Sequence, residues 1–332
     1  MRVPTSAGDL YFKANASPHA FEAALLVILE RRQPGRVPEV VATDPKRAWL
    51  LMRDGGTRLR EQLTSAADLF HWEELLPTYA ELQLSLAPHV DELLGAGVPD
   101  ERLAVLPAHL EELLADRDAL LIDLPNGVTS EQYRQLCELV PEFVAAGDRL
   151  ASFGIPETLQ HDDFHDGNIF IRDGRYLFFD WGDSCISHPF HTMVVTLRAI
   201  AHSLELPPGG PDLVRLRDAH LEPFSQYGSH EELAAAVDLA ARSEQPPVAQ
   251  DLVPGRIRDR PPGHAHSAPL LPRRDSLRGG RQTVPRKSGG ANGKEAAGDS
   301  PRNAASATGE ESIRVSEGGL RMSHHVAARI RG

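Results

Sequence analysis

The chain contains, at residues 159–183, the run LQHDDFHDGNIFIRDGRYLFFDWGD. Within this run, two apolar segments flank the pair Asp173-Gly174. An Asp-Gly pair between two apolar segments is a strong signal for a β-hairpin with a two-residue turn. We therefore expect a short antiparallel hairpin, with Asn168 at the base of its first strand and Asp180 at the base of its second strand.

A tight hairpin brings its two ends together, so Asp163, Asn168 and Asp180 should converge on one small volume. Two carboxylates and an amide form an oxygen-rich site that suits Mg²⁺, which takes a few protein oxygens and fills its other positions with phosphate and water. Phosphoryl transfer needs a metal to neutralise charge, and a carboxylate to orient the attacking hydroxyl and accept its proton. The stretch therefore predicts a site for this chemistry.

The pattern His-x-Asp-Phe-x-x-x-Asn at residues 161–168, followed by Asp-Trp-Gly at residues 180–182, resembles the catalytic and metal-binding loops of a known family. That family comprises the aminoglycoside phosphotransferases and the choline kinase-like small-molecule kinases. The resemblance implies an α+β, two-lobed protein-kinase-like fold, with a small antiparallel-sheet lobe and a mainly helical lobe that carries the catalytic hairpin. It also implies ATP, or another nucleoside triphosphate, and Mg²⁺ as cofactors, and a small-molecule hydroxyl as the acceptor.

The resemblance assigns roles to single residues. It makes Asp163 the catalytic base, and it makes Asn168 and Asp180 the metal ligands. Three further residues would support the loop: His161, His165 and Asp183. Each of these residue types is common in turns when taken alone, so the assignment depends on their joint order and spacing. Asp162 and Asp166 are expected to be solvated loop residues.

By the same resemblance, the N-terminal part binds the nucleotide. Lys13, in a strand-like run, would hold the α- and β-phosphates, and Glu22, in the following helix, would pair with it. Leu51 and Met52 would flank the adenine ring next to the hinge between the lobes. The resemblance extends over about residues 2–242.

The chain departs from the family pattern in three places. The family has a further strand and a Gly-rich phosphate-covering loop before the strand that begins here at Arg2, whereas Gly8 lies in a turn. Either the start site is misassigned or the nucleotide lobe is truncated. In the family, a further acidic residue usually follows the metal-binding Asp, whereas residues 187–190 of this chain read SHPF and contain no acid. The last helices of the family are replaced, after residue 241, by the C-terminal tail. These departures keep open the alternative of a catalytically impaired remnant that binds nucleotide weakly or not at all.

The rest of the chain is predicted to form short strands followed by helices. Alternation and turn residues predict strands at residues 2–4, 10–14, 37–42 and 48–52. Helical periodicity predicts helices at residues 19–32, 66–94, 106–116 and 130–153. We expect Ser130 to cap the last of these helices and Pro141 to kink or divide it.

The composition changes abruptly after Gln245. Residues 246–332 carry 15 Lys and Arg against 8 Asp and Glu, with 12 Gly, 9 Pro and no Phe, Tyr or Trp. Such a segment buries too little apolar surface to offset its ordering entropy, so we expect a disordered basic tail. The tail is either a basic arm for an anionic partner or a solvated segment without a role, and a coding frameshift is one hypothesis for its origin.

The expected organisation has three parts. Residues 1–53 form a partial nucleotide-binding lobe, residues 54–245 form a helical lobe with the catalytic loop and metal site, and residues 246–332 form the tail. The net charge of −12 argues against a nucleic-acid-binding protein. Cys137 and Cys185 show no metal-binding spacing and are expected to be free thiols in a reducing cytoplasm.

No apolar run has the length of a membrane helix, and no signal-peptide pattern opens the chain. We expect a cytoplasmic protein, a monomer or weak dimer, that binds neither nucleic acid nor membrane. Acidic residues in the predicted helical region could line a substrate cleft, which would favour a cationic acceptor such as an aminoglycoside. The alternative is that these residues form a solvated helix face. The acidic residues concerned are Glu73, Glu74, Glu81, Asp91, Glu92, Glu111 and Glu112. A protein-kinase function is disfavoured because no Ala-Pro-Glu segment follows Asp180.

Overall fold

The computed structural model describes residues 1–125 and 127–244, so the predicted tail at residues 246–332 lies outside the described residues. The strands are β1 (Arg2–Thr5), β2 (Gly8–Ala14), β3 (Val40–Asp44), β4 (Trp49–Arg53), β5 (Thr57–Arg58), β6 (Thr158–Gln160), β7 (Ile169–Arg172), β8 (Arg175–Phe178) and β9 (Cys185–Ser187). The α-helices are α1 (Glu22–Arg32), α2 (Phe70–Leu86), α3 (Val90–Gly95), α4 (Leu106–Ala115), α5 (Ser130–Ala151), α6 (His191–Ser203), α7 (Pro211–Leu221) and α8 (His230–Glu244). Short 3-10 helices are η1 (Ser17–His19), η2 (Leu59–Glu61), η3 (Ala66–Leu69), η4 (Ala87–His89), η5 (Trp181–Asp183) and η6 (Glu222–Tyr227).

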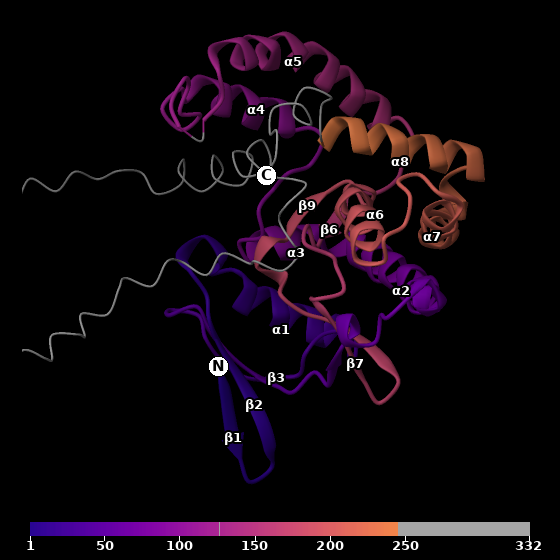
Figure 1. Ribbon diagram of the computed structural model, residues 1–332. Helices are drawn as coiled ribbons and strands as arrows, with labels where there is room; N and C mark the ends of the chain where they lie inside the picture. The colour runs from indigo at the N-terminus through magenta and orange to yellow at the C-terminus, as the bar shows by residue number, and fades with distance from the viewer. Residues whose placement is uncertain (126, 245–332) are drawn as a thin grey trace, which may run out of the picture. The chain divides into compact units, whose positions relative to one another are not determined.

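The predicted α+β architecture is confirmed, with an antiparallel sheet near the N-terminus and helices in most of the remaining described chain (Figure 1). The first sheet has the order β1-β2-β4-β3, and every neighbouring pair is antiparallel. Helix α1 packs against this sheet through buried apolar residues, which are Ala23, Leu25, Leu26 and Leu29. The strand β4 ends at Arg53, next to the predicted boundary between the lobes, which stays a prediction.

Helix α1 begins later than its sequence pattern predicts. The prediction placed its start at His19, whereas the regular helix begins at Glu22 and is preceded by the 3-10 turn η1. Pro18 lies in that turn, where its fixed φ and missing N–H are tolerated. The consequence is that Glu22 lies in the first turn of α1, with its side chain buried.

The helical region predicted at residues 66–94 is broken into four elements. Asp68 closes a capping box with Ser65 at the start of η3, and α2 follows. The 3-10 turn η4, which contains Pro88, then separates α2 from α3, since a proline cannot donate to the preceding turn. The prediction that this region is helical is therefore confirmed, whereas the prediction of one continuous helix is wrong.

For the helix at residues 130–153, the predicted N-cap and the predicted division at Pro141 are wrong, whereas the predicted kink at Pro141 stays a prediction. Its N-cap is Thr129, which forms a capping box with Gln132, whereas Ser130 is already helical and its backbone N–H donates to Asp123. Pro141 does not divide the helix, because α5 runs unbroken from Ser130 to Ala151. Pro141 is exposed, so the hydrogen bond that it removes is lost at a face where water can replace it.

The hairpin predicted around Asp173-Gly174 is confirmed. Its strands β7 and β8 pair from Ile169 opposite Phe178 to Arg172 opposite Arg175. Both turn residues have positive φ, 52° and 70°, as a two-residue turn with Asp-Gly requires. Strand β5 pairs with β7, which gives a three-stranded sheet of order β5-β7-β8.

A buried aromatic cluster fixes this hairpin against α2. The ring of Tyr79, from α2, stacks on Phe164 at a centroid distance of 4.0 Å and meets Phe178 edge-on at 5.6 Å. Phe164 and Phe178 also contact each other at 5.3 Å. All three side chains are fully buried, so the loop before β7 and the end of β8 pack on the same helix.

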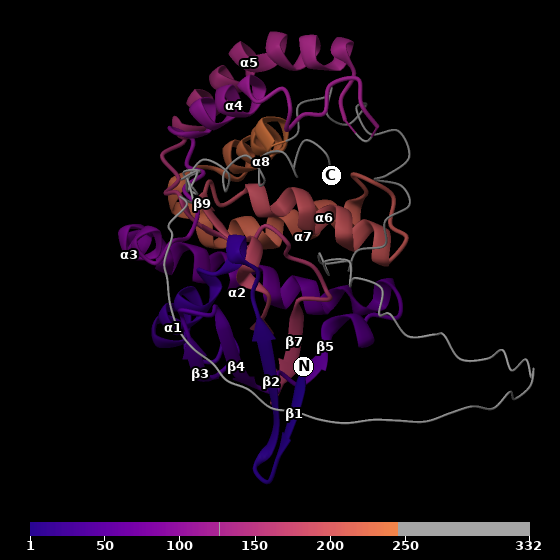
Figure 2. The same ribbon diagram turned by 90° about the vertical axis from the view of Figure 1, so that its left-hand side faces the viewer.

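A second, smaller cluster of buried apolar side chains joins α4 and α5, which lie beside each other in both views (Figures 1 and 2).

In the described part of the chain, no helix is both long and apolar enough to span a bilayer. Cys137 is exposed and Cys185 is buried, and neither forms a disulfide bond.

His220 is a buried histidine in the middle of the helical core. Its ring lies among Tyr79, Phe190 and Phe224, neither ring nitrogen makes a well-formed hydrogen bond, and the backbone of Leu76 offers only a weak interaction. Burial lowers the pKa of His220 from 6.5 to about 4. The folded chain therefore holds this imidazole in its neutral form.

We predict that His220 makes folding acid-sensitive. Between its unfolded and folded pKa values, the unfolded chain binds a proton that the folded chain does not, so the free energy of unfolding falls as the pH drops. The His220 contribution should amount to about 3 kcal/mol between pH 7 and pH 4. Urea denaturation of wild type and His220→Leu across this range should show the variant losing less stability on acidification. Parallel pH dependence in the two proteins would contradict the assignment.

Candidate active site

The base of the β7–β8 hairpin is closed by hydrogen bonds that bring the predicted site residues together. The backbone N–H of Phe179 donates to the carbonyl of Asn168 at 2.8 Å. The Asn168 side chain donates through Nδ2 to both the carbonyl and the Oδ2 atom of Asp163, each at 3.0 Å. Asp163 and Asn168 therefore lie in contact, and Asp180 follows Phe179 directly.

His161 holds the same region from the other side. Its Nε2 donates to the carbonyl of Phe179 at 2.7 Å, and its backbone N–H donates to the hydroxyl of Tyr79 at 3.0 Å. The ring is fully buried, and burial lowers the pKa of His161. This neutral ring ties the start of the loop to the residue before Asp180, and its predicted supporting role stays a prediction.

Lys13 and Asp180, 167 positions apart in the chain, form an ion pair. The Lys13 Nζ atom lies 2.5 Å from Asp180 Oδ1 and 2.6 Å from Glu22 Oε2. Burial opposes the charge on Lys13, but the two carboxylates outweigh it and raise the pKa of Lys13. Asp180 itself has a left-handed backbone conformation with φ 61°, which is uncommon for a residue other than glycine.

Helix α1 is also tied to the turn that follows Asp180. Glu22 Oε1 accepts the backbone N–H of Trp181 at 3.0 Å, so this buried carboxylate serves both the lysine and the turn. The Nδ1 atom of His19 donates to the carbonyl of Gly182 at 2.7 Å, and it lies 3.8 Å from Asp183 Oδ1. Sequence reasoning missed His19, because nothing in its local pattern indicates a partner 163 positions away.

Asp163 is a partly exposed carboxylate, with 35% of its side chain exposed, and it is held in its ionised form. Burial opposes its charge, but hydrogen bonding with His165 and Asn168 outweighs that effect and lowers the pKa of Asp163. The Nε2 atom of His165 lies 3.4 Å from Asp163 Oδ2. The neighbouring carboxylates likewise outweigh burial and raise the pKa of His165.

The tautomer of His165 follows from the donors around its ring. The backbone N–H of Gly167 points at Nδ1 from 2.9 Å, whereas the carboxylate of Asp166 lies 3.6 Å from the same atom. One nitrogen cannot accept from Gly167 and donate to Asp166, and the shorter contact is the one with Gly167. In the neutral form of the ring, Nδ1 therefore accepts from Gly167 and Nε2 carries the proton, toward Asp163.

The prediction that Asp166 is a solvated loop residue is wrong. Its side chain is only 4% exposed, and Arg60 of η2 lies 2.8 Å away. Burial raises the pKa of Asp166, but His165 and Arg60 outweigh it and lower this pKa to about 2. The local sequence could not reveal this pairing, because Arg60 lies 106 positions away.

Only one of the two residues predicted to flank the nucleotide base shares a sheet face with the lysine. Lys13 is opposite Leu50, and residues two apart on β4 share a face, so Met52 lies on the Lys13 face. Leu51 lies on the opposite face, because successive side chains of a strand alternate. The predicted contacts of Leu51 and Met52 with the nucleotide base both stay predictions.

Two aromatic rings lie under the segment that follows β4. Phe170 and Phe179 have a centroid distance of 4.4 Å. A Cβ atom added to Gly55 would lie 2.5 Å from the Phe179 ring and 3.1 Å from the Phe170 ring. Glycine at position 55 therefore lets the backbone pass directly over these rings, which sequence reasoning did not identify.

Three of the acidic residues considered for a substrate cleft have separate partners. Glu74 accepts the hydroxyl of Tyr176 at 3.0 Å, and Glu92 accepts Arg32 Nη2 at 2.6 Å. Glu73 accepts Arg215 Nε at 2.6 Å. These contacts lead to different elements, and a cationic acceptor stays a prediction.

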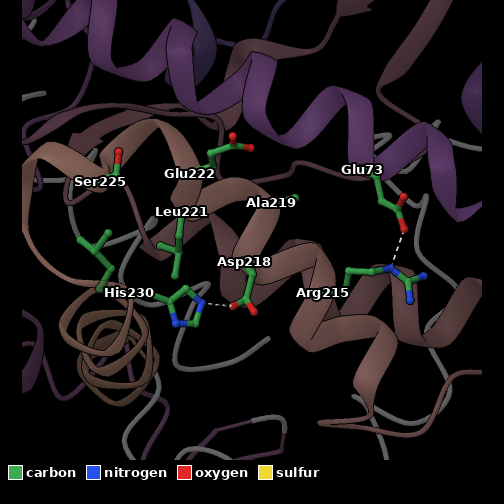
Figure 3. A pocket seen from close by; sticks show the side chains of 9 residues that line it. Glu73, Arg215, Asp218, Ala219, Leu221, Glu222, Ser225 and His230 are labelled. Carbon is green, nitrogen blue, oxygen red and sulfur yellow. Dashed lines mark hydrogen bonds and ion pairs between the residues drawn. The ribbon is translucent and has the colours of Figure 1, made fainter.

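A separate hollow of about 460 Å³ lies between α2, α7, η6 and the start of α8 (Figure 3). Its lining residues are Glu73, Arg215, Asp218, Ala219, Leu221, Glu222, Ser225, His230 and Leu233. Glu73 pairs with Arg215, and Asp218 lies 3.0 Å from His230 Nε2, as the dashed lines in Figure 3 show. None of the predicted catalytic residues lines this hollow, so it is distinct from the site at the hairpin base.

The donor atoms at the hairpin base fit a magnesium ion that shares its ligands with phosphate. Asn168 uses its Nδ2 for Asp163, which leaves its amide oxygen for a cation, and Asp180 has a second carboxylate oxygen beyond the one that contacts Lys13. Within the described ranges, no cluster of three or more His, Cys, Asp and Glu side chains could hold a metal. Mg²⁺ commonly takes one or two protein ligands and completes its shell with phosphate and water, so the donor set suits it.

A comparison with protein families identifies what this site resembles. The sequence model of the phosphotransferase enzyme family (APH) matches residues 10–233, which is more than half of the chain and includes every predicted site residue. No curated protein matches the sequence significantly.

Several solved structures are similar at low identity. The GDP and kanamycin complex of APH(2″)-IIia shares 18% identity with a TM-score of 0.45, covering 75% of this chain and 81% of that chain. Aminoglycoside phosphotransferase APH(3″)-Id from Streptomyces rimosus, with ADP and streptomycin, shares 16% identity with a TM-score of 0.41, covering 72% and 92%. An ethanolamine kinase from Plasmodium vivax shares 12% identity with a TM-score of 0.46, covering 71% and 66%.

We predict that Gly167 cannot carry a side chain without damage to the loop. A Cβ atom there would lie 2.7 Å from His165 Cε1 and 2.9 Å from Arg60 Nη2. Gly167→Ala should therefore lower the free energy of unfolding by about 1–3 kcal/mol, the usual range for overpacking. The matched control is Gly147→Ala in α5, where a Cβ meets nothing within 4 Å, and it should stabilise by roughly 0.5–1 kcal/mol. Chemical denaturation checks both, and equal behaviour of the two variants would refute the steric argument.

Proposed function

This chain belongs to the phosphotransferase enzyme family, and on that premise we propose that it transfers the γ-phosphoryl group of ATP, or of another nucleoside triphosphate, to a hydroxyl of a small molecule. One observation supports the proposal most strongly. The hydrogen-bonded pair Asp163–Asn168 and the ion pair Lys13–Asp180 meet at the base of the same hairpin. These are the groups that phosphoryl transfer to a hydroxyl requires.

Asp163 is proposed as the general base. Its lowered pKa keeps it ionised at neutral pH, and the Nδ2 of Asn168 orients the carboxylate through Oδ2. As the acceptor oxygen bonds to the γ-phosphorus, the bond from that phosphorus to the bridging oxygen breaks and the nucleoside diphosphate leaves. Asp163 takes up the hydroxyl proton in this step.

Lys13 is proposed to hold the phosphates of the nucleotide. Glu22 positions its ammonium group from a site where the carboxylate is 1% exposed. The same ammonium contacts Asp180. Asn168 and Asp180 would hold Mg²⁺, which when bound supplies charge neutralisation on the phosphates.

The nucleotide base is proposed to lie near Met52 and the Phe170–Phe179 ring pair. Gly55 brings the backbone after β4 close to these rings, which places hydrogen-bonding backbone groups beside an aromatic surface.

The alternative of a catalytically impaired remnant makes a different prediction for nucleotide binding. Calorimetric titration of the full chain with Mg·ATP should show binding if the proposal holds, and the absence of binding would favour the remnant.

We predict that Asp163→Asn lowers turnover by roughly 10²–10⁴-fold, the usual span for loss of a general base. The measurement is phosphate transfer from Mg·ATP to a panel of hydroxyl-bearing metabolites and antibiotics. The matched control is Asp173→Asn at the hairpin turn, where the side chain is 88% exposed and asparagine tolerates positive φ. Near-normal turnover in Asp163→Asn would exclude this residue as the base.

We also predict that Asp180→Ala abolishes metal-dependent turnover and weakens Mg·ATP binding. The substitution removes the proposed metal ligand and leaves the Lys13–Glu22 pair in place. A magnesium titration of turnover and of nucleotide affinity in wild type and variant checks this. An unchanged magnesium response in Asp180→Ala would rule out its proposed metal-binding role.

A further inference from the structure

Asp166 is a buried carboxylate whose oxygens are each bound by a different part of the chain. Its Oδ1 atom accepts from Arg60 Nη2 at 2.8 Å and from Arg60 Nε at 3.2 Å. Its Oδ2 atom accepts from Ser203 Oγ, at the end of α6, at 3.4 Å. With a side chain 4% exposed, Asp166 has little contact with water and is held by these partners.

Arg60 reaches Asp166 from the segment that follows the first sheet. It lies in η2, directly after β5, and β5 pairs with β7 of the hairpin. The backbone N–H of Arg60 donates to the carbonyl of Asp166 at 3.2 Å, in addition to the two side-chain contacts. This arginine therefore joins the residues after β4 to the loop that carries Asp163 at three points.

The ring of His165 lies between this ion pair and Asp163. Arg60 Nη2 lies 3.3 Å from His165 Nδ1, the atom that also accepts the backbone N–H of Gly167. On the other edge of the ring, Nε2 faces Asp163 Oδ2 at 3.4 Å. The ring is 7% exposed, so its orientation is set by these contacts and by its packing.

We propose that Arg60 and Asp166 form a positioning pair that fixes the His165 ring and, through it, the carboxylate of Asp163. The inference rests on the proposed function, since it concerns the carboxylate proposed there as the base. Neither Arg60 nor Asp166 is assigned a contact with substrate, and both act through His165. The pair also links the segment after β4 to the loop that carries Asp163, because Arg60 lies in that segment and contacts Asp166 and His165 of the loop.

Hydrogen exchange tests the structural part of the proposal without any need for an acceptor. The amides of Gly167 and Asn168 donate to His165 Nδ1 and to the His165 carbonyl, both at 2.9 Å. In Arg60→Ala these two amides should exchange at least about tenfold faster by NMR, as expected for local opening, while amides of β6 stay unchanged. Unchanged exchange at residues 167 and 168 would overturn the proposal.

The matched control for that experiment is Arg102→Ala. Arg102 also pairs with an aspartate through two contacts, at 2.9 Å and 2.7 Å to Asp100, and its exposure of 37% is close to the 39% of Arg60. In the part of the chain that the structure describes, Arg102 forms its ion pair with Asp100 and no hydrogen bond or ion pair with the loop at residues 161–168. The control variant should leave the exchange of Gly167 and Asn168 as in wild type, and acceleration there too would show a general loss of stability and overturn the specific role.

Kinetics test whether the pair acts through Asp163. With Mg·ATP as donor and water as the acceptor, Arg60→Ala should lower kcat by roughly 10–100-fold, the range found for residues that orient a functional group without touching the substrate. The affinity for Mg·ATP should stay within about threefold of wild type. In an Asp163→Asn background, the same substitution should cause little further loss, because the group that it positions is absent. Asp166→Asn, which keeps the shape and removes the charge, should behave in the same way.

The outcomes separate this inference from the proposed function. If Asp163→Asn turns over normally, the proposed function fails, and the hydrogen-exchange result still decides whether Arg60 holds the loop. If Asp163→Asn is impaired and Arg60→Ala is not, the positioning role fails while the function stands. Equal losses from Arg60→Ala in both backgrounds would also overturn it, because a residue that acts through Asp163 cannot be independent of it.

Discussion

Closure of the β7–β8 hairpin at its base is the constraint on which the candidate site depends. The backbone bond from Phe179 to Asn168 and the bond from the His161 ring to the Phe179 carbonyl hold the two ends together. The stacked rings of Tyr79 and Phe164 fix the loop before the hairpin to α2. Because both ends are held, a short hairpin is enough to bring the amide of Asn168 and the carboxylates of Asp163 and Asp180 to one place.

The ion pairs at the base of the hairpin are partly buried, so the loss of one partner should affect stability more than the loss of a partner in a surface ion pair. An exposed pair contributes little to stability, whereas removing one partner of a buried pair leaves a charge without compensation. Lys13 is the cation for both Glu22 and Asp180, so it joins the sheet, α1 and the hairpin at one atom. A phosphate group that replaces Asp180 as its partner would keep that charge compensated, which fits the proposed nucleotide site.

The sequence indicated the parts of the site that depend on local patterns. The Asp-Gly turn predicted the hairpin, and the spacing of Asp163, Asn168 and Asp180 predicted their convergence. Features that depend on tertiary partners were not predictable: Asp166 reads as a loop residue, and only Arg60 makes it a buried ion-pair member. The face on which Leu51 lies is set by strand register, and the continuity of α5 through Pro141 depends on its exposure. These are properties of pairing and packing, which a single sequence does not state.

The most direct test of the account is a crystal structure of the full chain with Mg²⁺ and a non-hydrolysable ATP analogue. The account predicts that the metal contacts the amide oxygen of Asn168 and the carboxylate of Asp180, that Lys13 contacts phosphate oxygens, and that the γ-phosphate faces Asp163. A nucleotide bound elsewhere, or one whose phosphates point away from the hairpin base, would contradict it.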